Sequence, residues 1–326
     1  MTELISVVIP LHNAARTIGA TLASACMQTH RAIEVLVVDD GSTDDSAAIV
    51  RAAMRDDPRV RLFSQDNMGV AAARNRGIAM ARGRYIAPLD ADDLWAPRKL
   101  ERQLACLQAA SQDTALVHCW YAIIDADDRV IVEKRHPYQG RVLHALALFN
   151  FLGHGSGPLI RKDALDAAGG YDSSFRAMGA EGCEDYCLYF RLAERYEFAL
   201  MPEVLVGYRE TPECMSADYR QALRSRAILL ERLSARHPAL RPLFHRSFNR
   251  LLGFRLARAI RNGHKREAFL IALKMLSHAP CFALASMARR GPIVLARQLR
   301  KRPSIAAGHQ TRLILKLGEL DSSGFG

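Results

Sequence analysis

The chain has 326 residues, of which 49% are hydrophobic and 24% charged, an ordinary composition for a globular protein. This length allows a full catalytic domain with a smaller appendage. No apolar run reaches about 18 residues and no basic segment leads into an apolar core at the N-terminus, so we expect neither a spanning helix nor a signal peptide.

Strand and helix patterns alternate through the first 110 residues. Continuous apolar runs predict buried strands over residues 5–10, 33–38, 60–64 and 84–89. Helical spacing and capping residues predict helices over residues 17–28, from a cap at Ser42 onward, and over 69–81 and 97–110. Such alternation is typical of βαβ units and predicts an α/β fold with a parallel, doubly wound sheet.

The pattern changes in the rest of the chain. It predicts strands over residues 115–124, 130–133 and 198–208, a glycine-rich loop over 151–158 and a helix over 184–194. From residue 217 onward it is almost only helical, with helices predicted over residues 219–236, 239–262, 264–278 and 283–300. We therefore expect a helical C-terminal region.

Charge is distributed unevenly between these parts. Residues 1–216 hold 29 acidic and 23 basic side chains, whereas residues 217–326 hold 5 acidic and 22 basic ones, giving the formal net charge of +11. The asymmetry predicts two functional regions, one over residues 1–216 and a basic helical one over residues 217–326. Any anionic partner surface would meet the second region.

The seven cysteines are scattered without the paired spacing of a zinc site. Cys183 and Cys187 are the tightest pair, and no His or Cys partner follows nearby. We expect reduced, mostly buried thiols and a cytoplasmic protein.

Polar residues follow three of the predicted parallel strands, where open α/β sheets bind their ligands. His12 and Asn13 follow the first strand, and Asp39 and Asp40 end the second. A carboxylate there can accept a hydrogen bond from a ribose hydroxyl or a base imide, or it can simply begin the next helix. Neither a Gly-x-Gly-x-x-Gly motif nor a P-loop follows any strand, which argues against dinucleotide binding and against a P-loop ATPase.

Three carboxylates, Asp90, Asp92 and Asp93, end the fourth predicted strand. In an extended backbone Asp90 and Asp92 would point to the same side. Two carboxylates aimed at one place suit a divalent cation that carries a diphosphate. A solvated acidic turn is the alternative that this motif alone leaves open.

The order of the motifs is more specific than any one of them. Residues 7–13, 28–29, 37–44, 67–77 and 89–93 in this order resemble the inverting glycosyltransferase family 2, over about residues 4–216. The resemblance implies a Rossmann-like, mixed and mostly parallel sheet of the GT-A type, flanked by helices. It also implies a nucleotide-sugar donor, expected to be UDP-linked, and Mn²⁺ or Mg²⁺ as the cofactor.

The resemblance implies roles for the residues around the donor. Pro10, His12 and Asp40 would line the nucleoside pocket, although the family often has Tyr where His12 stands. Arg74 would lie near the donor diphosphate, with a solvated helix arginine as the alternative.

The same resemblance assigns the three clustered carboxylates. Asp90 and Asp92 would reach the ribose and the metal with its diphosphate, and Asp93 would be a second metal ligand.

Sugar transfer with inversion needs one base for the acceptor hydroxyl, while the leaving diphosphate needs charge neutralisation. The family takes this base from a Glu-Asp pair that opens a helix, which resembles Glu184-Asp185 here. Asp185 is therefore the predicted base, with Glu184 and Glu181 as the other candidates. An acid that only stabilises a helix N-terminus is the alternative. His154 is expected to contact the acceptor, to close over the donor, or to be merely a loop histidine.

The C-terminal helices combine arginines such as Arg250, Arg255 and Arg258 with apolar residues such as Leu251 and Phe254. A basic amphipathic surface of this kind predicts peripheral binding to anionic lipid on the cytoplasmic face of a membrane. A soluble helical cap with solvated arginines is the alternative. A nucleic-acid partner is not expected, because no binding motif or aromatic platform accompanies the charge.

The sequence thus predicts a hexosyl- or N-acetylhexosaminyl-transferase that moves a sugar to a hydroxyl of a glycan or lipid-linked saccharide, in the synthesis of cell-surface polysaccharide or glycoconjugate. A nucleotidyltransferase of similar fold is one alternative, but residues 10–16 lack its glycine-rich basic loop. A non-catalytic carbohydrate- or membrane-binding adaptor is the other. Asp40, Asp92 and Asp185 argue against it.

Overall fold

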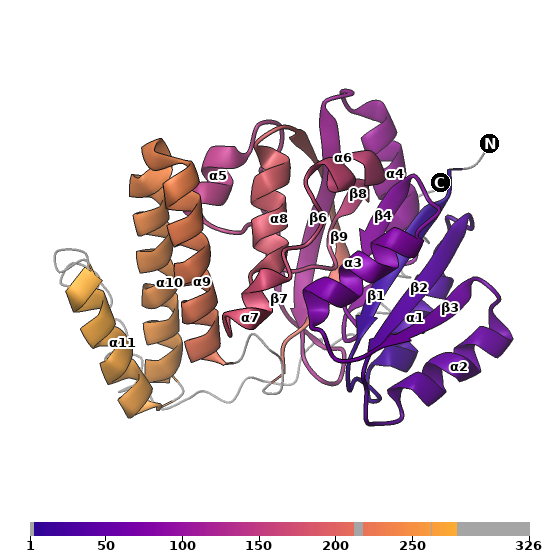
Figure 1. The fold of residues 1–326 in the computed structure, drawn as a ribbon, viewed down its shortest axis with the longest axis horizontal. Helices are drawn as coiled ribbons and strands as arrows, with labels where there is room; N and C mark the ends of the chain where they lie inside the picture. Colours follow the sequence, from indigo (N-terminus) through magenta and orange to yellow (C-terminus); the bar gives the residue numbers. More distant parts are fainter. Residues whose placement is uncertain (1–2, 212–217, 262, 279–326) are drawn as a thin grey trace, which may run out of the picture.

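The computed structural model describes residues 3–211, 218–261 and 263–278 of the chain (Figure 1). The strands there are β1 (Ile5–Leu11), β2 (Ile33–Asp40), β3 (Val60–Gln65), β4 (Tyr85–Pro88), β5 (Leu94–Trp95), β6 (Thr114–Ile124), β7 (Val130–Lys134), β8 (Leu159–Arg161) and β9 (Glu197–Arg209). The α-helices there are α1 (Ile18–Cys26), α2 (Ser46–Asp56), α3 (Val70–Met80), α4 (Lys99–Ala109), α5 (Leu143–Leu148), α6 (Lys162–Ala167), α7 (Ser174–Ala177), α8 (Glu184–Ala193), α9 (Tyr219–Arg236), α10 (Arg241–Arg261) and α11 (Lys265–His278).

These strands form one mixed sheet in the order β3-β2-β1-β4-β8-β6-β9-β5, with β7 beside β6. β3, β2, β1 and β4 are parallel neighbours, and every residue of β1 and β2 is buried, as their apolar runs predict. Leu11 pairs with Asp39, so the carboxyl ends of β1 and β2 meet at one edge of the sheet. The polar residues after these strands therefore share that edge.

The second half of the sheet mixes strand directions. β8 is antiparallel to both β4 and β6, β6 is parallel to β9, and β9 is antiparallel to β5. This confirms the mixed, helix-flanked α/β sheet. β5, β8, α5, α6 and α7 have two to six residues each, too few to show a period in the sequence.

Helix α2 begins later than the sequence suggests. Ser42 does not cap it, because the helix starts at Ser46 and the Asp44 carboxylate accepts from the Ser46 N–H at 3.0 Å. The Ser42 hydroxyl instead accepts from the Asn13 N–H at 3.1 Å and joins the ends of β1 and β2. The helix predicted over residues 283–300 lies outside the described residues.

The C-terminal helices pack on the second half of the sheet region. In Figure 1, α9 and α10 lie side by side next to α8, and α11 lies outermost. One hydrophobic cluster includes Leu188 and Phe190 of α8 together with Phe244 and Leu252 of α10, and the Phe190 and Phe244 ring centroids are 5.7 Å apart. The two regions divided at residue 216 therefore share a core, although their division into two functional domains stays a prediction.

Two smaller findings concern membranes and thiols. In the part of the chain that the structure describes, no helix has both the length and the apolar character needed to span a bilayer. The five cysteines there are free, and Cys119, Cys183 and Cys187 are buried.

Candidate functional site

A cleft of about 940 Å³ opens at the carboxyl ends of β1, β2 and β4 and extends to the start of α8 and to the sides of α9 and α10. It collects residues that the sequence singles out from six separate segments. These are Pro10, His12, Asp40, Arg74, Asp90, Asp92, His154, Glu181, Glu184 and Asp185. The fold thus brings nearly every predicted site residue together, and Asp93 is the exception.

Asp40 is buried at the end of β2 and organises the loop that follows β3. Its Oδ1 accepts from the Met68 N–H at 2.7 Å and from Gln65 Nε2 at 2.8 Å, and its Oδ2 accepts from the Gly69 N–H at 2.7 Å. A carboxylate offers about four acceptor positions. Asp40 therefore retains about one for a ligand, and its larger role is to hold the start of α3 against β2.

His12 lies beside Asp40 on the exposed side of the cleft. Its Nδ1 is 3.0 Å from the Asp40 carbonyl oxygen, and its Nε2 is 3.3 Å from Asn67 Nδ2. We assign the Nδ1–H tautomer, because that nitrogen then donates to the carbonyl and Nε2 accepts from the amide. The imidazole face is thereby fixed at the cleft, where it is available for stacking on a planar group.

Arg74 is a buried residue of α3, with an exposed fraction of 3%, and is not a solvated helix arginine. Its guanidinium forms ion pairs with Asp90 through Nη2 and with Glu184 Oε1 through Nη1, the latter at 3.1 Å. Burial acts to lower its pKa, but Asp90, Tyr171 and Glu184 raise the pKa well above its usual value. Arg74 thus connects the end of β4 with the start of α8.

The three clustered carboxylates do not sit on an extended strand. β4 ends at Pro88, and the Asp93 N–H donates to the Asp90 carbonyl at 3.1 Å, so residues 90–93 form a turn. The expectation that an extended backbone points Asp90 and Asp92 to the same side is therefore wrong about the backbone. Asp90 and Asp92 nevertheless both line the cleft.

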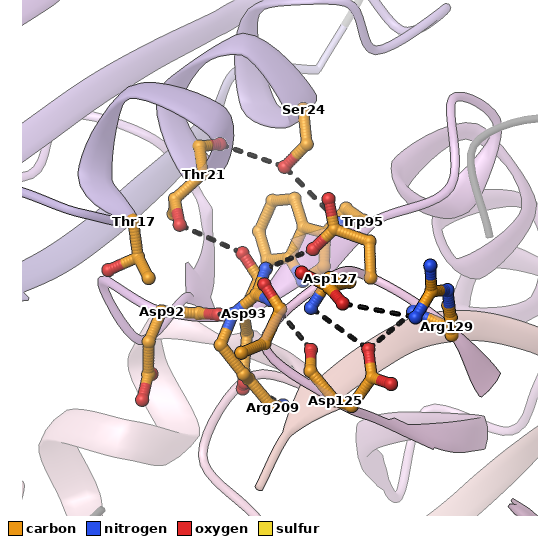
Figure 2. A network of polar contacts seen from close by, with 12 residues as sticks. Thr17, Thr21, Ser24, Asp92, Asp93, Trp95, Asp125, Asp127, Arg129 and Arg209 are labelled. Atoms are coloured by element: carbon orange, nitrogen blue, oxygen red, sulfur yellow. Dashed lines mark hydrogen bonds and ion pairs between the residues drawn. The ribbon is translucent and has the colours of Figure 1, made fainter. Parts of the chain in front are cut away.

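Asp93 does not line the cleft and lies within a network of polar contacts (Figure 2). Its side chain is completely buried, its Oδ1 accepts from the Arg209 N–H at 2.9 Å, and its Oδ2 accepts from the Ser156 hydroxyl at 2.5 Å. Figure 2 shows the Asp92 side chain extending away from this group. Both Asp93 oxygens serve internal hydrogen bonds, so its expected role as a second metal ligand gains no support from this geometry.

Arg209, at the end of β9, fixes the shape of the same turn (Figure 2). Its Nε donates to the Asp92 carbonyl at 2.8 Å, and its guanidinium also donates to the Asp125 carbonyl at 2.9 Å and to Asp128 Oδ1 at 2.5 Å. The sequence shows only that a Tyr-Arg pair ends this strand. Its role depends on partners more than 80 residues away along the chain.

The glycine-rich loop at 153–157 lies against the turn of Asp90 to Asp93. The Ser156 hydroxyl accepts from the Asp90 N–H at 2.9 Å. A Cβ atom at Gly155 would lie 2.7 Å from Arg74 Nη2, so the close approach of this loop needs glycine. Ser156 was not predicted as a site residue, and only the glycine pattern around it signals a tightly packed loop.

His154 is buried in this loop and stacks on Tyr208, with ring centroids 5.1 Å apart and an interplanar angle of 22°. Its Nδ1 accepts from the Ser156 N–H at 3.2 Å. Burial lowers the pKa of His154 to about 3, so the imidazole is neutral near pH 7. It is therefore an ordered, uncharged wall of the cleft and not a mobile loop histidine.

Asp185 is the carboxylate at this site that is best suited to accept a proton. Burial and the neighbouring Glu184 carboxylate raise its pKa to about 7, against the opposing effect of Arg74. Glu184 is already engaged, because its Oε1 pairs with Arg74 and its Oε2 accepts from the Gly182 N–H at 2.8 Å. A carboxylate with a pKa near 7 is matched to general-base chemistry at neutral pH.

A divalent cation at this site would need a bound substrate to supply some of its ligands. Among the described residues, no group of three or more His, Cys, Asp or Glu side chains could hold a metal ion by itself. Mg²⁺ and similar ions commonly use one or two carboxylates together with substrate phosphates. Asp92 and Asp90 fit that pattern, because both reach the cleft and their oxygens are hard ligands.

Comparisons with known proteins bear on the family and the fold. The family model described as "Glycosyl transferase family 2" matches residues 6–169. An uncharacterized glycosyltransferase of Rickettsia typhi is 29% identical over 212 residues, which are 64% of this chain and 64% of that protein. An uncharacterized glycosyltransferase of a Nostoc species is 33% identical over 195 residues, 57% of this chain and 59% of that protein. The match thus spans less than two thirds of these relatives' length.

Two solved structures share the fold at low sequence identity. TarS residues 1–349 of S. aureus in complex with UDP-GlcNAc has a TM-score of 0.61 at 15% identity, covering 90% of this chain and 87% of that one. A mannosyltransferase from Pyrobaculum calidifontis in complex with GDP-Man and Mn²⁺ has a TM-score of 0.55 at 20% identity, covering 90% and 78%. This likeness confirms the predicted GT-A type of fold.

Proposed function

Because the chain belongs to glycosyltransferase family 2, we propose that it transfers a sugar from a UDP-linked donor to an acceptor hydroxyl with inversion at the anomeric carbon. The observation that carries the proposal is the bridge made by Arg74. It joins Asp90, at the donor end of the cleft, to Glu184, the residue before the candidate base Asp185. A donor group and a proton acceptor can thereby be held in one rigid arrangement.

The donor occupies the edge of the sheet where β1, β2 and β4 end. Pro10 and His12 line the nucleoside end, Asp40 holds the loop beneath it, and Asp90 lies nearer to the sugar and diphosphate. The UDP-GlcNAc complex of TarS and the GDP-Man complex of the Pyrobaculum enzyme support a nucleotide-sugar donor. The transferred group is proposed to be a hexosyl or N-acetylhexosaminyl unit.

The reaction needs one proton transfer and one substitution. Asp185 takes the proton from the acceptor hydroxyl as its oxygen attacks the anomeric carbon. The bond from that carbon to the diphosphate oxygen breaks on the opposite face, so the configuration inverts and the nucleoside diphosphate leaves. Arg74 holds Glu184, and through it the start of α8, so that Asp185 faces the donor.

Mn²⁺ or Mg²⁺ is the proposed cofactor, with Asp92 as its main protein ligand and Asp90 beside it. The Mn²⁺ of the Pyrobaculum neighbour supports this choice of ion class. When bound, the cation would neutralise the negative charge that develops on the leaving diphosphate.

The acceptor is proposed to be a glycan or a lipid-linked saccharide used for cell-surface polysaccharide or glycoconjugate. Exposed apolar side chains on the outer helices support a peripheral position on the cytoplasmic face of a membrane. They are Phe254 of α10 and Phe269, Leu270 and Leu273 of α11, and Lys265 and Arg266 lie on the same helix as the last three. Apolar and basic groups together suit an anionic lipid surface.

Purified protein tests the function directly. It is incubated with a panel of UDP- and GDP-linked sugars and Mn²⁺ or Mg²⁺, and binding is measured by calorimetry and turnover by release of the nucleoside diphosphate. We expect one UDP-sugar to bind in a metal-dependent manner and to be turned over slowly by water. Failure of every nucleotide sugar to bind, with and without metal, would contradict the proposal.

A further inference from the structure

Two arginines of the C-terminal helices line the cleft instead of facing solvent. Arg226 of α9 and Arg255 of α10 border it together with the small or apolar side chains of Ala222 and Leu251. Part of the excess positive charge of the C-terminal region is therefore directed into the site. Contact with a membrane or with bulk solvent does not explain why these two arginines lie there.

Arg226 lies directly beside the start of α8. Its guanidinium carbon is 4.3 Å from the centroid of the Tyr186 ring, and the Ser225 hydroxyl fixes this part of α9 by donating to the Glu181 carbonyl at 2.7 Å. Among the described residues, the Arg226 Nε has no hydrogen-bond partner. In contrast to Arg74, with its two carboxylate partners, Arg226 is held by the Tyr186 ring and a hydrogen bond with Cys183, and it keeps donor capacity for a ligand.

Arg255 is also poorly exposed, with an exposed fraction of 8%. Burial and the neighbouring Arg258 lower its pKa, whereas Glu210, Glu267 and Tyr208 oppose this shift. Arg258 is itself paired with Glu210 at 2.5 Å. An anion entering the cleft beside Arg255 would offset part of the cost of burying its positive charge.

Asp185 lies within electrostatic range of Arg74 and Asp90, at the end of the cleft assigned to the donor, and also of Arg226 on α9. The acceptor hydroxyl must reach Asp185, so the part of the acceptor next to that hydroxyl would extend toward Arg226 and Arg255.

We propose that Arg226 and Arg255 form a subsite for an anionic group of the acceptor, a phosphate or a carboxylate carried near the attacked hydroxyl. The planar fork of a guanidinium pairs with either group through two parallel hydrogen bonds. The assignment of this subsite to the acceptor depends on the proposed transferase function. The existence of an anion site at these two residues does not depend on that function.

Calorimetric titration of the full chain with methyl phosphate, and separately with acetate, tests the subsite. The protein is first saturated with UDP and Mg²⁺, and ionic strength is kept constant with chloride. We expect saturable binding of one of the two anions, and the preferred one identifies the class of acceptor group. Arg226→Gln combined with Arg255→Gln should weaken this binding at least tenfold, while UDP affinity stays within about twofold of wild type.

Matched variants separate the subsite from general effects. Arg224→Gln removes an exposed charge from the same helix α9 and should leave anion binding unchanged. Arg226→Met keeps the side-chain stem over Tyr186 and should lose binding without unfolding, which thermal unfolding checks. The subsite is wrong if neither anion binds wild type, if the double variant binds as wild type does, or if saturation with UDP abolishes anion binding. In the last case the two arginines belong to the donor diphosphate. If the wild-type protein does not bind UDP, this result would count against the proposed donor site and not against the anion site.

Discussion

Arg74 and Glu184 form a buried ion pair, with 3.1 Å between Nη1 and Oε1, that joins helix α3 to helix α8 across the cleft. The same guanidinium also pairs with Asp90. Helix α3 follows the donor edge of the sheet, and α8 begins beside the candidate base, so this pair links the two halves of the proposed site.

Arg74→Met should reduce both stability and activity. Removing one partner of a buried ion pair leaves the other uncompensated, which typically costs about 3–5 kcal/mol in the free energy of unfolding. Urea unfolding measures this loss, and donor titration should show weakened binding. Arg76→Met, an exposed position on the same helix, is the matched control and should change neither quantity. A further Glu184→Gln substitution should cost less in the variant than in wild type, and full additivity of the two losses would contradict the pairing.

Asp185→Asn should keep donor affinity and lose turnover by about 100-fold or more, the usual scale for a general base. The substitution is nearly isosteric and removes only the proton acceptor. Transfer rate and calorimetric donor affinity are measured on the same preparation. If Asp185→Asn retains near-normal turnover while Glu184→Gln loses it, the base is Glu184.

The pH dependence of the reaction should follow the ionisation of Asp185. Its pKa is raised to about 7, so below that pH most molecules carry a protonated carboxyl that cannot accept the acceptor's proton. We expect kcat/KM to rise tenfold per pH unit below 7 and to level off above it. His154, with its pKa lowered to about 3, adds no transition in this range. A flat profile between pH 5.5 and 7.5 would show that Asp185 is not the titrating base.

Asp185→Asn should also raise stability at alkaline pH. The pKa of Asp185 is higher in the folded protein than in the unfolded chain, so wild type loses stability as pH rises from about 4 to about 7 and the full loss is present above pH 7. The asparagine variant lacks this loss. Its advantage should be on the order of a few kcal/mol at pH 8 and should vanish near pH 4. Urea unfolding at both values checks the prediction, and an equal difference at the two would refute it.

Asp92 and Asp93 should respond differently to substitution. Asp92→Ala should abolish metal-dependent donor binding while the fold survives, because its side chain reaches the cleft. Asp93→Ala should chiefly lower stability, by about 1–3 kcal/mol, because it leaves the Arg209 N–H and the Ser156 hydroxyl without their acceptor. Calorimetry with UDP and Mn²⁺ and thermal unfolding distinguish the two. Unchanged metal-dependent affinity in Asp92→Ala would overturn the assignment of the metal ligand.

The outer helices should bind vesicles that contain anionic lipid, and salt should weaken this binding through screening. Removing residues 217–326 is a poor test, because α10 shares a core with α8. Phe269→Ser with Leu273→Ser instead removes two exposed apolar side chains of α11 and should reduce co-sedimentation several-fold. Met27→Ser, an exposed apolar residue after α1, is the control. If wild type stays in the supernatant at low salt, the peripheral position is wrong.

The sequence alone determined the elements with a clear period and the order of the motifs. Buried apolar runs predict β1 and β2, and helical spacing predicts α8 to α11. Polar positions after strands predict the cleft residues His12, Asp40 and Asp90, whereas Arg74 and Asp185 are assigned by the family resemblance. These features are local, because strand ends, helix periods and motif order depend on neighbouring residues.

Only the tertiary structure decided where the site's charged side chains point. Asp93 and Asp92 are adjacent in sequence, yet Asp93 turns inward because Ser156 and Arg209, 63 and 116 residues further on, supply its hydrogen bonds. Arg74 is a buried residue of the cleft because Glu184, 110 residues away, completes its pair. Arg226 reaches the cleft because α9 packs beside α8. A carboxylate or guanidinium takes its direction from the partners that compensate its burial, and those partners are set by contacts that no local pattern encodes.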